Sequence, residues 1–386
     1  MDCTLTEEQR LLQDSVARFL ERQYGFAARQ RILAGAGFDE AMWAQMAANG
    51  WLAALLPAAL GGIGGAVETM VLMELAGRHL VLEPLVPCVL IAARILGAAP
   101  SDASRERCLR ALLAGGTRIS LAVMESTMRS PYELAQTQCV ATVQGTGWLL
   151  SGLKTFVDGG GAANHFLVTA RDSATGQLAV FSVPEGAPGL TRRSLRTLDG
   201  RTSAELQLAG VAVAAPERLL AGPEAAAALE CALDHGVAAV CAEAVGLMDA
   251  LLQTTIEHTR QRVQYGAPLA SFQALQHRMA DMYVELEAAR SMALLATAAV
   301  DGGEERAARI CAARIQVGRA ARFIGQQAVQ LHGGMGMAEE HSVAHYFKRL
   351  TLISQLCGDE RLHLRRYRAV TAIRDIDAAT SQRNAT

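Results

Sequence analysis

Apolar and polar positions follow a helical period over the first part of the chain. Thr6 followed by Gln9 forms a capping-box signature, which predicts that a helix begins just after Thr6. The glycine-rich segment 61–65 breaks the pattern, and we interpret it as a loop between helices. We therefore predict an α-helical domain over 1–117. The apolar residues that share the first helical face are Leu11, Leu12, Val16, Phe19 and Leu20.

The pattern changes in the middle of the chain. Short segments there carry β-branched and aromatic residues, and Gly, Asp and Ser turns separate them. This alternation predicts a small antiparallel β-domain over 118–222. The expected strands are Ile119–Met124, Cys139–Gln144, Trp148–Ser151, His165–Ala170 and Leu178–Val183.

The last part of the chain has a helical pattern again. Ala225–Arg262, Phe272–Asp301 and Glu304–Leu331 are amphipathic stretches, each longer than an average globular helix. Long antiparallel helices with apolar faces usually form a bundle. We therefore predict a helical bundle over 223–386, and a fold that is mainly α with a β-domain insert.

Composition narrows the class of protein. The chain has 386 residues, of which 51% are hydrophobic and 19% charged, so it can bury a large core. Its formal net charge is -2, which implies no basic face and argues against nucleic acid as a partner. The eight cysteines are scattered without a CxxC pair, so we expect reduced, small apolar residues and no metal site.

Targeting and membrane signals are not expected either. The opening sequence MDCTLTEEQRLL does not have the pattern of a signal peptide. The apolar run Val81–Leu96 is interrupted by Glu83, Pro84 and Pro87, which argues against a membrane span. We expect a cytoplasmic protein without a membrane partner.

The clearest candidate for chemistry is the segment 330–336, Gln-Leu-His-Gly-Gly-Met-Gly, which interrupts a region of otherwise helical pattern. Each glycine costs roughly 1 kcal/mol relative to alanine in a helix interior, so three close together need a reason. A glycine turn lets backbone approach a ligand closely, and a phosphate-bearing cofactor is the common candidate.

Three blocks of sequence resemble a known family. They are 262–282 (RVQYGAPL, then SFQALQ and ADM), 328–336 (AVQLHGGMG) and 5–10 (LTEEQR). Together with Gly50–Trp51 and Gly61–Gly62, they closely resemble the acyl-CoA dehydrogenase family over nearly the whole chain. The resemblance implies an N-terminal helical domain, a middle β-domain and a C-terminal four-helix bundle, with FAD between the last two.

The resemblance also implies an assembly of two or four chains that share FAD across subunit boundaries. One subunit holds the flavin ring, and its neighbour reaches the pyrophosphate and adenine. An arginine cation and exposed backbone N–H groups suit a pyrophosphate. By this resemblance, the cofactor-binding residues of the C-terminal part are Arg262, Tyr265, Phe272, Gln330, Gly333 and Gly334.

The implied reaction is α,β-dehydrogenation of an acyl-CoA thioester. A carboxylate removes the proton next to the carbonyl, a hydride passes to the flavin, and the electrons leave to an electron-transfer flavoprotein. A carboxylate is a weak base, so it needs an acidified substrate proton and a pKa raised by a water-poor pocket.

The base position of this chain departs from the family. The family Glu stands before Gly-Thr, and the matching stretch here is 356–360, Leu-Cys-Gly-Asp-Glu. Gly358 takes the base position, whereas Asp359 lies one residue later. A slip of one residue would bring Asp359 into the pocket, since the neighbouring glycine permits close backbone approach. The alternative is that Asp359 is a solvated turn or cap residue.

A few relatives carry the base on the first long bundle helix. The matching position here is Gly236, which cannot serve, and Glu243 lies two turns later on the same face. A carboxylate in the apolar stretch 236–248 would have a raised pKa if it had no partner. Glu243 is therefore a candidate for a displaced base or a polar group at the pocket floor. The alternatives are a pair with a buried arginine or a place at a subunit interface.

The β-domain motifs depart as well. The segment 124–131 keeps Ser130 of the family motif Thr-Glu-Pro-Gly-Ala-Gly-Ser-Asp but lacks its glycines. The segment 154–160 resembles Lys-x-Trp-Ile-Thr-Asn-Gly, with Asp158 in place of the threonine at the flavin edge. An anion there disfavours negative charge on a reduced flavin. By this resemblance, the flavin-contact residues are Met124, Ser130, Phe156 and Asp158.

These departures leave three hypotheses open. The first is an FAD-dependent acyl-CoA dehydrogenase, alone or as a homo-oligomer. The second is a non-catalytic subunit of a heterotetramer that completes the FAD site of a related larger subunit, because the segment 345–359 resembles the small subunits of two-gene enzymes such as pimeloyl-CoA dehydrogenase. The third is a flavin-dependent oxidase or monooxygenase of the same fold.

Three histidines are minor candidates for a role at the site. His332 lies inside the glycine turn, where it would contact the cofactor or cap the turn by a local hydrogen bond. His341 and His345 are four residues apart, but no third metal ligand accompanies them, so a solvated helix face is favoured.

Overall fold

The computed structural model of the chain describes residues 4–303 and 305–383, in two compact units. The helix–sheet unit comprises 6–72 and 81–236. The bundle unit comprises the described residues of 1–5, 73–80 and 237–386. Cys3 and Glu304, which entered the sequence predictions, lie outside the described residues. The predicted boundaries at 117 and 222 stay predictions.

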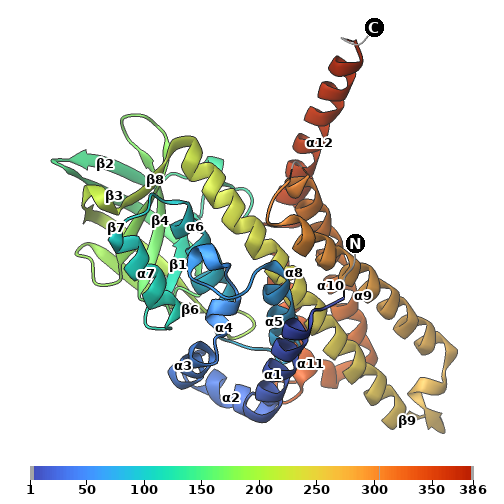
Figure 1. Ribbon diagram of the computed structural model, residues 1–386. Helices are drawn as coiled ribbons and strands as arrows, with labels where there is room; N and C mark the ends of the chain where they lie inside the picture. Colours follow the sequence, from blue (N-terminus) through green and yellow to red (C-terminus); the bar gives the residue numbers. More distant parts are fainter. Residues whose placement is uncertain (1–3, 304, 384–386) are drawn as a thin grey trace. The chain divides into compact units, whose positions relative to one another are not determined.

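Short helices form the first part of the helix–sheet unit (Figure 1). The capping box is confirmed, because Thr6 Oγ1 accepts the N–H of Gln9 at 3.2 Å and Gln9 Oε1 accepts the N–H of Thr6 at 3.0 Å. Trp43 and Trp51 are buried in this part. The elements are α1 (Glu7–Gln23), α2 (Phe26–Ala34), α3 (Glu40–Ala48), α4 (Trp51–Ala54), η1 (Ala58–Leu60), α5 (Ala66–Arg78), η2 (Val86–Ile91), α6 (Ala92–Ala98) and α7 (Ala103–Leu113).

A single sheet follows, with strand order β6-β7-β3-β2-β4-β5-β8 and β1 paired to β4. The prediction of an antiparallel sheet holds for most pairs, but β1 and β2 run parallel to β4. Buried Phe166, Phe181 and Leu206 belong to its core. The elements are β1 (Ile119–Ala122), η3 (Leu134–Gln136), β2 (Val140–Gln144), β3 (Gly147–Asp158), β4 (His165–Asp172), β5 (Leu178–Pro184), β6 (Leu190–Arg196), β7 (Thr202–Val213), η4 (Ala215–Glu217) and β8 (Arg218–Ala221).

The bundle unit contains the three predicted long helices. Its elements are most of α8 (Gly222–Gln261), β9 (Val263–Gln264), β10 (Ala267–Pro268), η5 (Leu269–Ser271), α9 (Gln273–Ala299), α10 (Arg306–His332), η6 (Gly333–Met337), α11 (Ser342–Ile353) and α12 (Glu360–Arg383). The C-terminal end of α5 packs against α8 in this unit. A Cβ on Gly77 would lie 2.1 Å from the Glu243 carbonyl oxygen, and one on Gly246 would lie 1.8 Å from the Glu74 carbonyl oxygen. Only glycine permits this crossing.

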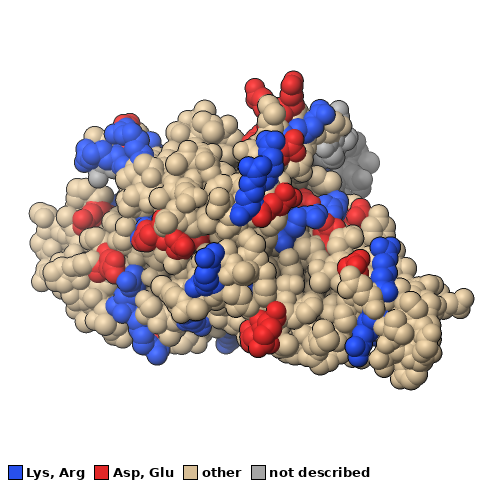
Figure 2. All heavy atoms as spheres, turned by 90° about the horizontal axis from the view of Figure 1, so that it is seen from below, with Lys and Arg blue, Asp and Glu red and all other residues tan. Residues whose placement is uncertain are grey.

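Helix α8 is the one helix of the described residues that is long and apolar enough to cross a membrane. Its most apolar window is 89% buried, which is the character of a core helix. The charged side chains on the face in Figure 2 are of both signs and interspersed, in keeping with the net charge of -2.

Candidate functional site

The cofactor-binding motif after α8 forms an exposed hairpin. Arg262 directly follows the helix and is exposed. Tyr265 has a positive φ of 54° and is 94% exposed, and its ring makes an edge contact with Phe272 at 6.4 Å between centroids. A bulky residue with a positive φ is uncommon, and such strained backbone positions cluster at active sites and ligand-binding sites.

The glycine turn begins where α10 ends at His332. Gly333 has a φ of +62°, a conformation that glycine adopts without strain. A Cβ built on Gly333 or Gly334 would meet nothing within 4 Å, so the backbone of the turn is open to approach. Gln330, Gly333 and Gly334 are exposed. A cation and an open glycine backbone at neighbouring helix ends fit the diphosphate of a dinucleotide cofactor.

A histidine cluster joins these two motifs. The ring of His332 stacks on His258 of α8 at 4.2 Å between centroids, and it meets the ring of His341 at 5.3 Å. His332 Nδ1 also forms the local hydrogen bond expected of a turn cap, to the Ala328 carbonyl oxygen at 2.9 Å. The three rings come from distant parts of the sequence, so no local pattern could reveal the cluster.

His341 and His345 were the other two histidine candidates. Among residues 4–303 and 305–383, no group of His, Cys, Asp and Glu could hold a metal ion. The alternative of a solvated helix face is wrong for His345, which is 3% exposed and whose Nε2 lies 2.8 Å from the Glu339 carbonyl oxygen.

Glu243 is paired with a buried arginine. Its Oε1 accepts from Arg349 Nε at 2.8 Å, and its Oε2 accepts from Arg349 Nη2 at 2.7 Å. The two residues are 0% and 3% exposed. A two-bond ion pair of this kind uses both carboxylate oxygens and orients them toward the guanidinium. The structure therefore provides the pairing that the sequence left as an alternative to a displaced base.

Asp359 caps a helix. Its Oδ1 accepts the N–H of Leu362 at 2.8 Å, at the beginning of α12. The preceding Gly358 has a φ of +106°, and Cys357 has a φ of +53°. This geometry matches the cap alternative, because a side-chain oxygen satisfies one of the free N–H groups of a helix start. Whether Asp359 also reaches a substrate stays a prediction.

The predicted flavin-contact segments of the β-domain are held together. The Met124 carbonyl oxygen accepts the N–H of Thr155 at 2.9 Å, beside Phe156, which has a positive φ of 44°. Ser130 is 1% exposed, whereas Met124, Phe156 and Asp158 are half-buried.

A buried ion pair supports these segments, and the sequence interpretation missed it. Lys154 Nζ lies 2.6 Å from Glu125 Oε1 and 2.9 Å from Thr169 Oγ1, and Lys154 is 0% exposed. Glu125 Oε2 also accepts the N–H of Gln138 at 2.7 Å. Burial lowers the pKa of Lys154, which Glu125 opposes. The signal was present, since Glu125 and Lys154 lie inside the two β-domain segments, 124–131 and 154–160, that align with family motifs.

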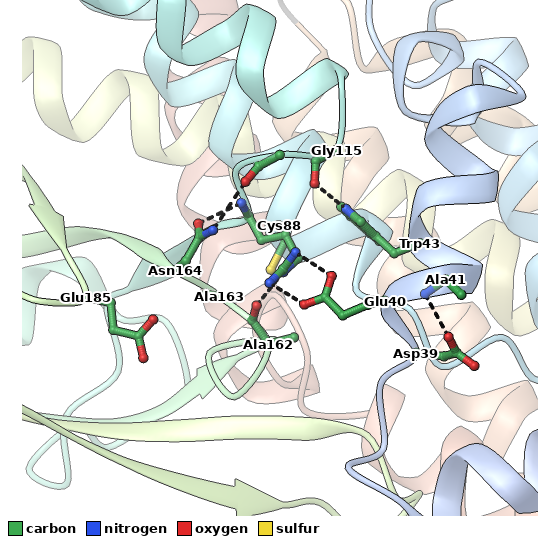
Figure 3. A network of polar contacts seen from close by, with 12 residues as sticks. Asp39, Glu40, Ala41, Trp43, Cys88, Gly115, Ala162, Ala163, Asn164 and Glu185 are labelled. Carbon is green, nitrogen blue, oxygen red and sulfur yellow. Dashed lines mark hydrogen bonds and ion pairs between the residues drawn. The ribbon is translucent and has the colours of Figure 1, made fainter.

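A second polar network fixes the turn after Asp158 (Figure 3). Arg118 donates to both oxygens of Glu40, at 3.1 and 2.9 Å, and to the Ala162 carbonyl oxygen at 2.5 Å. Asn164 accepts the Arg118 N–H at 3.0 Å, and Trp43 Nε1 donates to the Gly115 carbonyl oxygen at 2.9 Å. These contacts tie α3 to the loop 159–164.

The fold and these motifs define a flavoprotein of the acyl-CoA type, and the comparisons agree. The N-terminal, middle and C-terminal domain models of acyl-CoA dehydrogenase match residues 6–116, 120–211 and 225–370. The chain belongs to the acyl-CoA dehydrogenase family, whose members are flavoprotein oxidoreductases acting on the CH–CH bond of acyl-CoA.

Similar proteins match nearly the whole chain. Acyl-CoA dehydrogenase IpdE2 of Mycobacterium tuberculosis is 31% identical over 94% of this chain and 97% of its own length. A variant of the Tcur3481-Tcur3483 steroid ACAD has 30% identity and a TM-score of 0.85, covering 97% of this chain and 100% of that chain. The ChsE4-ChsE5 complex from Mycobacterium tuberculosis has 27% identity and a TM-score of 0.84, covering 96% and 99%.

Proposed function

We propose that this chain is a subunit of an FAD-dependent acyl-CoA dehydrogenase, and that it supplies Arg262 and the glycine turn to FAD held by a neighbouring subunit. Two parts of this chain differ in how free they are to meet a ligand, and the proposal rests on this difference. The diphosphate half-site is exposed and open, whereas both candidate bases are engaged in contacts of the fold.

The two candidate bases argue against independent catalysis. A general base must be free to accept the substrate proton within hydrogen-bond reach. Both Glu243 oxygens accept from Arg349, and one Asp359 oxygen accepts from the start of α12. A partner subunit with its own base therefore explains the chain better than a homo-oligomer.

The similar proteins support a partner subunit. Two of the solved structures carry two protein names each, Tcur3481-Tcur3483 and ChsE4-ChsE5. The first of these is named a steroid ACAD. By analogy, we expect a related chain beside this one and an acyl-CoA substrate with a bulky acyl group.

The residues of this chain have defined tasks in that assembly. When bound, FAD would supply the redox chemistry, as hydride acceptor for the acyl-CoA β-carbon, with an electron-transfer flavoprotein as the expected electron acceptor. Arg262 neutralises a phosphate charge, and the open backbone at Gly333 and Gly334 allows close approach of the diphosphate. Neither task requires a carboxylate base from this chain.

The test is the flavin content of the complex. We expect Arg262→Ala to lower FAD retention by about tenfold or more, because a hydrogen bond to a charged group contributes about 1.5–3 kcal/mol. Arg260→Ala is the matched control, since Arg260 is an exposed arginine of α8 two residues before Arg262. Flavin absorbance after gel filtration measures retention. Equal FAD content in the two variants would contradict the proposal.

A second candidate is that the chain carries its own base at Asp359. The left-handed turn at Cys357 and Gly358 favours it, because it brings backbone and a carboxylate together near the family base position. In that case the chain purified alone would reduce its own flavin when the right acyl-CoA is added.

A further inference from the structure

Three histidines from separate segments meet at one end of the bundle unit. His258 lies in the last turns of α8, His332 ends α10, and His341 stands just before α11. The His258 and His332 rings are nearly parallel, with an interplanar angle of 24°. The His332 and His341 rings are inclined at 61°. His332 is the central ring and is 5% exposed.

This histidine cluster connects the two halves of the diphosphate half-site. Arg262 follows His258 by one helical turn, and its N–H donates to the His258 carbonyl oxygen at 2.9 Å. Gly333 directly follows His332. The turn then folds back onto that histidine, since a Cβ on Gly336 would lie 3.1 Å from His332 Cβ. The stacked rings therefore connect the helix end that precedes Arg262 to the glycine turn.

The surroundings of the cluster favour neutral imidazole rings. His332 Nδ1 faces a carbonyl oxygen, which only accepts, so this nitrogen carries the ring proton. Nε2 of His332 is buried and has no hydrogen-bond partner among the described residues. Burial lowers the pKa of His332 to about 4, and repulsion from His258 and His341 adds to the effect. Burial, His341 and Arg262 lower the pKa of His258.

The groups that face the cluster all become or are cations. They are His258 and His341 around His332, and Arg262 beside His258. Within residues 4–303 and 305–383, the charged groups that shift the pKa of His332 are His258 and His341, and both lower it. Protonation of the central ring would place like charges at contact distance and would also require water to reach Nε2.

We propose that the histidine cluster is a positioning device, whose neutral stack holds Arg262 beside the glycine turn and whose protonation loosens both. The inference rests on the proposed function for its ligand, the FAD diphosphate. His332, His258 and His341 are positioning residues that act through the turn and Arg262.

The first experiment measures FAD retention by the purified complex from about pH 8 to about pH 4, a range that extends to the lowered pKa of His332. Retention by the wild-type complex falls on acidification. His332→Phe keeps a stacking ring that cannot be protonated, so it retains FAD near neutral pH and flattens the acid side of the profile. His332→Ala lowers FAD retention by about tenfold or more at every pH, which corresponds to the loss of one contact.

The second experiment does not depend on FAD. In the chain alone, the N–H of Ala338 bonds to the Met335 carbonyl oxygen at 3.2 Å, so its hydrogen-exchange protection reports on the turn. His332→Ala lowers this protection, corrected for the intrinsic rate, whereas His332→Phe preserves it. His277→Ala is the control, because His277 is exposed on α9.

The outcomes separate the two ideas. A wild-type complex that binds no FAD overturns the proposed function. Unchanged protection of Ala338 in His332→Ala, a His332→Phe profile identical to that of the wild type, or tighter FAD binding by the wild type in acid each overturns the positioning role of the histidine cluster.

Discussion

Replacing Glu243 by glutamine tests whether this carboxylate is structural or catalytic. The substitution keeps the size of the side chain and removes its charge. Arg349 would then keep a buried guanidinium, 3% exposed, beside a neutral amide. One of the two hydrogen bonds at 2.8 and 2.7 Å would be lost, because the amide NH2 group of glutamine cannot accept from the guanidinium.

The cost follows from leaving one charge without its partner. Breaking a buried ion pair from one side costs about 3–5 kcal/mol of unfolding free energy, since the remaining ion cannot regain its hydration. Removing both charges with apolar residues of similar volume is often neutral. The variant Glu243→Leu/Arg349→Met should therefore recover most of the stability that Glu243→Gln loses.

Urea unfolding followed by helical circular dichroism measures these differences, as a shift of the midpoint at an unchanged slope. The matched control is Glu205→Ala, which removes the partner of Arg193 in a pair that is 66% exposed on the arginine side. Exposed pairs contribute about 0–1 kcal/mol, so the control should hardly move.

The reasoning would be refuted by the opposite pattern. If Glu243→Gln unfolds within about 1 kcal/mol of the wild type, the pair is not the buried, coupled unit described here. If the complex also loses acyl-CoA dehydrogenation by a factor of about a hundred without losing stability, Glu243 is a base, since general-base catalysis contributes that much or more.

Two further predictions concern carboxyl groups. Asn is as good a helix cap as Asp, so Asp359→Asn should leave the stability and turnover of the complex unchanged. Asp359→Ala should lower the free energy of unfolding by about 1 kcal/mol in the same urea assay. A large loss of turnover in Asp359→Asn would instead identify Asp359 as a base. Burial raises the pKa of Glu83 to about 7, although the Tyr24 hydroxyl donates to it. Because the pKa of Glu83 is raised in the folded state, the contribution of Glu83 to the free energy of unfolding is fully present below about pH 4.5, the unfolded value. This contribution is lost as the pH rises through 7, by up to roughly 3 kcal/mol. Glu83→Gln should flatten that dependence in urea unfolding at several pH values, and an unchanged slope would contradict the assignment.

Local signals in the sequence predicted the elements well. The capping box at Thr6 depends on residues three positions apart, so it could be read directly. The first five strands carry β-branched and aromatic residues, whereas β6 (Leu190–Arg196) contains three arginines and β8 (Arg218–Ala221) is short. Their strand character comes from pairing with β7 and β5, which a single segment does not show.

The site was harder to predict because its partners are distant in sequence. Glu243 and Arg349 are separated by 106 positions, so the sequence showed a carboxylate in an apolar helix without its counter-ion. The histidine cluster combines residues 258, 332 and 341, which only the crossing of α8, α10 and the start of α11 brings together. Family motifs could be carried over by position, but the contacts that decide their chemistry could not.

The turn at Gly358 explains why the family base cannot simply be restored in this chain. Gly358 has a φ of +106°, which a side-chain residue rarely adopts. A Cβ there would lie 2.7 Å from Leu362 Cδ2 and 2.8 Å from His363 Nε2. His363 Nε2 in turn lies 3.0 Å from the Cys357 carbonyl oxygen, so the imidazole is held in that position. A glutamate at 358 would be strained in this backbone conformation and would have to move the Leu362 and His363 side chains. The local fold thus depends on the absence of a side chain at position 358, which is expected of a subunit whose base is supplied by its partner.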